Sequence, residues 1–437
     1  MLSGVIRLSI QHRWLVLMLT AAVAVLGFFA LLRLPIDAVP DISNKIVQIT
    51  TVYPALSPAE VEKQIAFPVE TALAGAPGLK STRSLTRNGF AQVEAIFEDG
   101  VDIYFARQQV LERLAEAREN MPPDVEPRMG PITTGLGEVY VYVVEYEHPE
   151  GKGAALQANG PGWQQDGSYL TPEGERLATE VEQAAYLRTL QDWLVKPQLR
   201  TVKDVAGVDT IGGYEKQYLV EPDPMKLVSY GLTMSQLAEA LERNNNSLGA
   251  GFIEHKGESF AVRADGRVRD AADIGAIVLG SKNGTPFHVR DVARVGVGRE
   301  LRTGAASQNG REVVVGTVLM LLGGNSRTVA NDVNDKVHGI QASLPPDVRL
   351  RPVLVRTELV DKTIDTVGHS LSIGAILVIV VLFLLLGNIR AAVITALAIP
   401  LAMLITALGM TRLGISGNLM SLRSEERRVG KECRSRW

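Results

Sequence analysis

Histidine is the residue of this 437-residue chain that most directly suggests metal chemistry, because neutral imidazole is a common metal ligand. The histidines are scattered, and no two have the i, i+4 spacing that would place both ligands on one face of a helix. We therefore interpret each of them as facing solvent. They are His12, His148, His255, His288, His338 and His369.

Other patterns that could carry chemistry are incomplete. The sequence Gly323-Gly324-Asn325-Ser326 lacks the following Gly-Lys-Ser/Thr of a phosphate-binding loop, so we interpret it as a strand-to-helix turn. No set of nucleophile, base and orienting residue is apparent, so no enzyme is predicted. The single cysteine, Cys433, leaves the rest of the chain without a disulfide or a thiolate metal site. A net charge of −3 argues against a nucleic-acid-binding protein.

Three apolar segments predict membrane-spanning helices. Residues Trp14 to Leu32 carry no charge and approach the roughly 20 residues that cross a bilayer. A cleaved signal peptide is the alternative, but no clear cleavage site follows this long run. The second segment is Leu371 to Leu386, extended toward Val367, and the third is Ala391 to Met410 with Pro400 inside it. The short link between these two predicts an antiparallel hairpin, and the proline implies further helices that satisfy its freed carbonyl.

Basic residues predict the orientation. Arg7 and Arg13 precede the first segment and Arg390 lies in the hairpin link, which places both on the cytoplasmic side. Residues 33 to 366 are then outside, in the periplasm if the cell is a bacterium.

The region between the helices alternates strands and helices, which is typical of compact α+β modules. Ile46 to Tyr53 has a strand pattern, and Ser57-Pro58-Ala59-Glu60 predicts a helix start with proline at the first position. A strand at Gln92 to Phe97 precedes a helix over 102–119, and a strand at Val313 to Leu321 precedes a helix from Ser326 toward Ile340. One buried face of helix 102–119 is expected to carry Ile103, Phe105, Val110, Leu111 and Leu114.

Two stretches differ from this pattern. Between Val208 and Leu279 the strands are shorter, a helix begins near Thr233, and Asn244-Asn245-Asn246 is a stop signal, which predicts an inserted subdomain. Residues 148–169 are rich in Gly, Gln, Asn and Pro, and we expect a flexible surface loop without a motif.

From Met1 to about Leu422 the sequence resembles the heavy-metal efflux branch of the resistance-nodulation-cell division (RND) transporters of Gram-negative inner membranes. The segments that carry the resemblance include LPIDAVPDIS, SPAEVEKQIAFPVE, FEDGVDIYFARQQVLERL, EPRMGPITTGLGEVY, LLGGNSRTVA and LLLGNIRAAVITALAIPLAM. The resemblance implies a membrane protein with α-helical transmembrane segments and α+β periplasmic porter subdomains of ferredoxin-like β-α-β units, which carry an inserted docking subdomain. We assign 1–36 to the N-terminus and transmembrane helix 1, 37–124 to the first porter subdomain, 125–207 and 280–345 to the second, 208–279 to the docking subdomain, 346–366 to a linker, 367–387 and 391–411 to transmembrane helices 2 and 3, and 412–422 to the approach to helix 4.

The resemblance also implies a function. Such proteins are homotrimeric, proton-driven exporters of divalent or monovalent metal cations in the inner membrane, and they work with a periplasmic adaptor protein and an outer-membrane channel. They need a proton gradient and no cofactor. The proton-relay acids of the family lie on the fourth helix, expected here after Leu422. Residues 423–437 instead read RSEERRVGKECRSRW, which is similar to a translated sequencing-adaptor oligonucleotide, so we expect a non-native tail and a truncated chain that is not transport-competent alone.

Three residues match metal-contacting positions of the family. Glu138 and Asp192 match acidic positions of the periplasmic cleft in zinc-type relatives, where carboxylates suit zinc or cobalt. Met420 matches a thioether position on the transmembrane path of copper and silver relatives. The ordinary alternatives are a solvated or capping acid and a packing methionine.

Two other functions stay open. A multidrug exporter of the same fold would need an aromatic-rich pocket, whereas aromatic residues make up only 5% of the chain. A membrane-anchored periplasmic scaffold or binding module would need only one anchoring helix.

Overall fold

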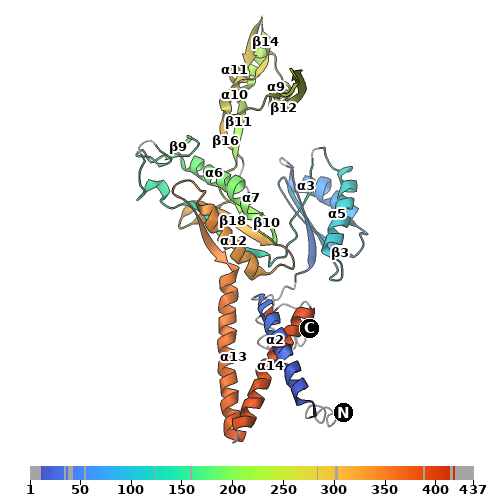
Figure 1. Ribbon diagram of the computed structural model, residues 1–437. Helices are drawn as coiled ribbons and strands as arrows, with labels where there is room; N and C mark the ends of the chain where they lie inside the picture. Colours follow the sequence, from blue (N-terminus) through green and yellow to red (C-terminus); the bar gives the residue numbers. More distant parts are fainter. Residues whose placement is uncertain are drawn as a thin grey trace.

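The computed structural model describes residues 11–33, 36–37, 43–53, 56–123, 125–157, 160–282, 284–300, 304–386, 389–413 and 417–418. Three tiers are visible in Figure 1: long helices at one end, two α/β units side by side in the middle, and a narrow insert at the other end.

The first α/β unit contains β2 (Lys45–Val52), β3 (Leu79–Arg87), β4 (Phe90–Phe97) and β5 (Arg128–Met129), in the antiparallel order β3-β4-β2-β5. Its helices are α3 (Pro58–Val61), the π-helical turn η1 (Glu62–Ala66), α4 (Phe67–Leu73) and α5 (Ile103–Arg118). The predicted helix start is confirmed, because Ser57 caps α3 in a reciprocal capping box with Glu60 and Pro58 is the first helical residue.

The predicted buried face of α5 is partly wrong. Ile103, Val110 and Leu114 are buried, but Phe105 and Leu111 are 45% and 58% exposed. Ala106 and Ala117 complete the buried face instead. These five buried positions are three or four residues apart, as one face of a helix requires, and the two larger side chains lie off that stripe.

The second unit repeats the topology of the first. Its strands β6 (Glu138–Tyr146), β10 (Val205–Ile211), β18 (Arg311–Met320) and β19 (Val348–Val355) are ordered β10-β18-β6-β19, and β17 (Ala306–Gln308) pairs with β18. Its helices are α6 (Glu180–Leu190), the π-helical turn η3 (Gln191–Val195), α7 (Lys196–Leu199) and α12 (Ser326–Gln341). Both units follow a β-α-β-β-α-β order.

The predicted linker at 346–366 is wrong, because β19 and the start of a long helix occupy it.

The insert lies between β10 and β18 of the second unit. This position corresponds to the β3–β4 turn of the first unit. A two-stranded ribbon of β11 (Lys216–Pro222) and β16 (Ala293–Arg299) supports it. Beyond the ribbon lie α8 (Pro224–Tyr230), α9 (Met234–Arg243), β12 (Ser247–His255), β13 (Glu258–Asp265), α10 (Ala271–Ala276), β14 (Val278–Lys282), β15 (Thr285–His288) and α11 (Val289–Val292). Thr233 caps α9 and Asn244 follows its last residue, as predicted. Residues 280–299, which we assigned to the second unit, belong to this insert.

The expectation of a flexible loop at residues 148–169 is also wrong. The chain there forms the short helix η2 (Pro149–Gly151) and the first two strands of a small sheet of β7 (Gly162–Trp163), β8 (Tyr169–Leu170) and β9 (Arg176–Leu177). Trp163 and Tyr169 are 1% and 0% exposed and join the core of the second unit. Two aromatic anchors thus order a segment whose composition is that of a loop.

The long helices are α2 (Arg13–Arg33), α13 (Arg356–Leu386) and α14 (Ile389–Leu413). In Figure 1, α13 descends from the second unit, α14 returns antiparallel to it, and α2 lies against α14. Among the described residues, one helix, α2 over Arg13–Leu31, is long and apolar enough to cross a membrane. Shorter apolar stretches cover Ser372–Val381 in α13 and Pro400–Leu413 in α14. Beyond these helices, β1 (Ile36–Asp37) pairs with β20 (Gly417–Asn418).

Candidate functional site

Glu138 is the first residue of β6 and is exposed. It lies opposite Leu319 of β18, next to a bulge in the register. Farther along β6, Tyr140 and Tyr142 are fully buried. Glu138 therefore stands where the central strand of the second unit emerges from the core.

Asp192 lies in η3, on the helix that faces the insert ribbon. One carboxylate oxygen is 2.5 Å from Arg188 Nε, and the other accepts a hydrogen bond of 3.0 Å from the Thr210 hydroxyl. Arg188 also donates to the backbone carbonyl of Gly212 at 3.0 Å. Each oxygen of Asp192 accepts one contact, so a cation that binds there would compete with the guanidinium for the carboxylate.

A buried polar chain holds η3 in place. The Tyr142 hydroxyl donates to Gln191 Oε1 at 2.9 Å, and Gln191 Nε2 donates to the Thr210 hydroxyl at 3.3 Å. Burial raises the pKa of Tyr142, which keeps its hydroxyl a neutral donor. Its ring crosses Gly316 on β18, where an added Cβ would be 2.2 Å from the ring. A glycine on the neighbouring strand therefore allows the tyrosine that positions Gln191 beside Asp192.

Asp192 borders an open pocket of about 590 Å³ at the base of the insert. Glu215 precedes β11 and Glu300 follows β16, and the Glu300 backbone N–H donates to the Glu215 carbonyl at 3.1 Å. Partial burial and the adjacent Glu300 carboxyl raise the pKa of Glu215. Basic residues balance the acids of the pocket, namely Arg188, Lys196 and Lys216. The pocket is therefore a mixed-charge junction between the second unit and the insert.

Glu215→Gln is expected to remove a pH dependence of stability. Because the pKa of Glu215 is higher in the folded chain, the folded state binds more protons, and its stability falls as pH rises from about 4.5 toward neutrality. The variant should therefore be more stable than the wild type at pH 7, by less than about 1 kcal/mol because the group is largely solvated. Thermal unfolding between pH 4 and 7 measures the difference. Glu242→Gln, at an exposed position on α9, is the control, and equal pH profiles for Glu215→Gln and the wild type would contradict this prediction.

Sequence reasoning missed a different group. Glu147, His148 and Asp347 each present a ligand atom, and all three atoms lie within 4.8 Å of one another. Within the described part of the chain this is the one such group of three or more His, Cys, Asp or Glu side chains. It contains neither Glu138 nor Asp192, and Met420 lies outside the described residues. The His148 side chain is 37% exposed, in line with our solvent-facing interpretation, but its Nδ1 lies 2.5 Å from Asp347 Oδ1, a pairing that the sequence did not predict.

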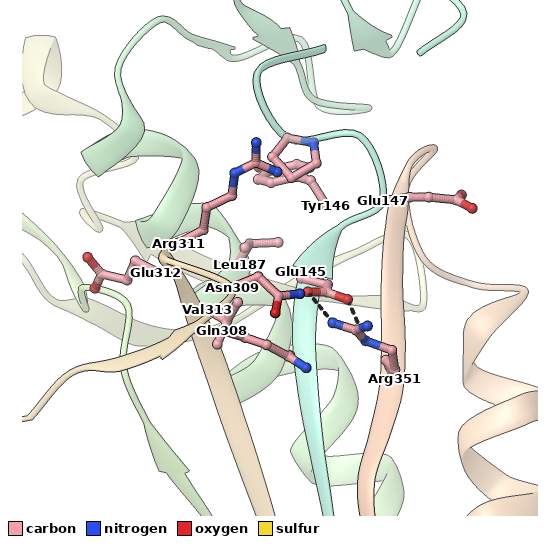
Figure 2. A pocket seen from close by; sticks show the side chains of 11 residues that line it. Glu145, Tyr146, Glu147, Leu187, Gln308, Asn309, Arg311, Glu312, Val313 and Arg351 are labelled. Atoms are coloured by element: carbon pink, nitrogen blue, oxygen red, sulfur yellow. Dashed lines mark hydrogen bonds and ion pairs between the residues drawn. The ribbon is translucent and has the colours of Figure 1, made fainter. Parts of the chain in front are cut away.

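The same strand ends carry a row of ion pairs. Figure 2 shows Glu145 of β6 paired directly with Arg351 of β19 at the edge of a pocket of about 220 Å³. Arg351 Nε and Nη2 lie 2.8 and 3.1 Å from the two Glu145 carboxylate oxygens. Arg349 pairs with Glu147 through its Nε and one carboxylate oxygen. Arginines of β19 therefore balance the acids on this edge of β6.

Comparisons with known proteins place these features in context. The family model of the AcrB/AcrD/AcrF family matches residues 5–424. The chain is 55% identical over 422 residues to the nickel and cobalt resistance protein CnrA of Cupriavidus metallidurans, and 50% identical over 422 residues to the cobalt-zinc-cadmium resistance protein CzcA of the same organism. These alignments cover 97% of this chain but 39% and 37% of the relatives. A crystal structure of a heavy metal efflux pump matches with a TM-score of 0.80 and 31% identity, over 95% of this chain and 39% of that one.

Proposed function

The chain belongs to the AcrB/AcrD/AcrF family of RND transporters, and from this premise we propose that it is the N-terminal portion of a proton-driven exporter of heavy-metal cations. The observation that carries the proposal is the 55% identity to a nickel and cobalt resistance protein, which extends over 97% of the chain. The chain spans about 39% of the length of that relative, so transport itself needs residues beyond those present here.

In this proposal each tier has a role. The two units of equal topology are porter subdomains on the periplasmic side of the inner membrane, and the ribbon-borne insert is the docking subdomain. Helices α2, α13 and α14 span the membrane, and the hairpin of α13 and α14 supports this role because a simple anchor needs only one helix. The partners are two further copies of the full-length protein, a periplasmic adaptor and an outer-membrane channel.

We further propose that Glu138 and Asp192 contact the exported cation in the periplasmic cleft and that Met420 does so on the transmembrane path. For Asp192 the structure supplies a specific requirement. The cation would compete with the guanidinium of Arg188, which already pairs with one of the two carboxylate oxygens. Carboxylate ligands suit nickel, cobalt or zinc better than Cu(I). The relatives named for nickel, cobalt and zinc resistance favour the same cargo.

A chimaera tests the proposal. Residues 1–422 would replace the matching part of the Cupriavidus nickel and cobalt resistance protein, in a strain that lacks this protein. We expect growth at nickel and cobalt concentrations that stop the deletion strain. Residues 1–437 alone should not restore growth, because the resemblance places the family's proton-relay acids on a fourth helix after Leu422, and residues 423–437 contain no such helix pattern.

Two results would contradict the proposal. A chimaera that accumulates in the membrane and changes drug tolerance, but not tolerance to nickel, cobalt, zinc, cadmium, copper or silver, would support a multidrug exporter. An accumulated chimaera that changes neither would support a scaffold. An Arg188→Lys chimaera is a second variant for the same assay. It keeps the positive charge beside Asp192 but loses the hydrogen bond that the guanidinium donates to the Gly212 carbonyl oxygen.

A further inference from the structure

We propose that Glu147, His148 and Asp347 form a binding site for a divalent cation of the zinc, cobalt or nickel class. One imidazole and two carboxylates are a ligand set that suits these ions. The ligand atoms already lie within 4.8 Å of one another. The site is separate from Glu138 and Asp192, and it stands whether or not the chain belongs to an exporter.

The sheet brings these residues together from distant parts of the chain. Val348 of β19 pairs with Tyr146 of β6, and one residue farther along the Glu147 N–H donates to the Asp347 carbonyl at 2.8 Å. Asp347 has φ +67, in the left-handed region that Asp and Asn tolerate better than most residues. This turn directs the Asp347 carboxylate at His148, which binds it through its backbone N–H at 3.1 Å and its ring at 2.5 Å.

A buried tryptophan orients the Asp347 carboxylate. Trp163 Nε1 donates to Asp347 Oδ2 at 2.7 Å, on the same oxygen that accepts the His148 backbone N–H. The Asp347 side chain is only 12% exposed. Oδ2 is therefore occupied by two donors, and Oδ1 is directed at the imidazole. Hydrogen bonds of this kind to a metal-binding carboxylate fix its orientation and strengthen binding.

Glu147 completes the site from the exposed side. Its carboxylate pairs with Arg349, and the two side chains are 40% and 54% exposed. An exposed pair of this kind contributes little, so Glu147 can exchange the guanidinium for a cation at small cost. Three protein ligands leave the remaining coordination positions to water. A bound cation would join β6, β19 and, through Trp163, the segment of β7 to β9.

Calorimetric titration of the purified chain in detergent with zinc, nickel or cobalt chloride tests the site. We expect His148→Gln and Asp347→Asn each to lose one bound ion or to bind it at least tenfold more weakly. Asparagine at position 347 keeps a residue that tolerates the left-handed backbone and can accept the Trp163 hydrogen bond, while it removes the charge. His255→Gln, on the exposed end of β12, is the matched control and should bind as the wild type does.

Two further measurements distinguish a metal site from a cluster of side chains that only form structural hydrogen bonds. Trp163→Phe keeps a buried ring but removes the N–H, and it should weaken binding by roughly 10- to 100-fold. Zinc should raise the melting temperature of the wild type and of His255→Gln but not that of His148→Gln, because only the folded site binds. If Asp347→Asn does not fold, Glu147→Gln at the exposed ligand replaces it. Equal stoichiometry and affinity in the wild type and in the folded ligand variants would overturn the proposal. The three side chains would then form structural hydrogen bonds without binding a metal ion.

Discussion

Trp163→Ala is expected to cost the second α/β unit about 3–5 kcal/mol of its free energy of unfolding. The indole is 1% exposed and makes edge contacts with Tyr146 and Tyr169, with ring centroids 5.2 and 5.4 Å apart. Alanine would leave a cavity among these rings and would remove the hydrogen bond to Asp347. Near-ultraviolet circular dichroism during thermal unfolding, which reports the packing of aromatic rings, measures the change.

Trp193→Ala is the matched control for this substitution. Trp193 lies in η3 of the same unit and is 81% exposed, so its removal should change stability by no more than about 0.5 kcal/mol. The contrast isolates burial, since both variants lose the same side chain. Equal melting temperatures for the two variants would mean that the segment of β7 to β9 does not pack on the core in solution.

Gly27→Leu is expected to separate α2 from α14. A Cβ at Gly27 would lie 2.6 Å from the Leu404 carbonyl oxygen and 2.9 Å from the Leu404 carbonyl carbon, both backbone atoms of α14. Backbone atoms of a helix cannot move aside singly, so the two helices must part and lose their close packing. A glycine at this position allows the two helix backbones to approach this closely. We expect a loss of about 1–3 kcal/mol, typical of overpacking, together with a lower melting temperature in detergent.

Gly409→Leu on α14 controls for the change of residue type. A Cβ at Gly409 meets no atom within 4 Å, so this variant should melt close to the wild type. Engineered cysteines on α2 and α14 supply a second measurement, because their cross-linking yield should fall in Gly27→Leu alone. Unchanged cross-linking in Gly27→Leu would contradict the packing of these helices.

Local signals in the sequence predicted local structure well. Ser57 and Thr233 were expected at helix starts, and each accepts a hydrogen bond from the third residue of its helix. A cap acts within one turn, so the residues that decide it are adjacent in the chain. Periodicity was less decisive on α5, where Phe105 and Leu111 are apolar yet exposed. Hydrophobic character alone does not say which apolar residues a helix buries, because packing partners lie elsewhere.

The site residues show the same division between local signals in the sequence and contacts that depend on tertiary structure. Asp192 could be named from the sequence, and Arg188 lies four residues before it on the same helical segment, but the contact with Thr210 depends on how η3 meets β10. His148 and Asp347 are 199 residues apart, and neither one's surroundings contain a signal for the other. Only the register of β6 against β19 brings them together.

The sequence by itself determined the apolar helices, the helix caps, the alternation of strands and helices, and the family. These depend on composition, on spacing within a few residues, and on long matching segments. The tertiary structure decided that Trp163 is buried in a segment with the composition of a loop, that 346–366 is a strand and a helix rather than a linker, and that His148 meets Asp347. Strand register and aromatic packing join residues far apart in the chain, and the free energy that selects them comes from burial of whole surfaces rather than from any local pattern.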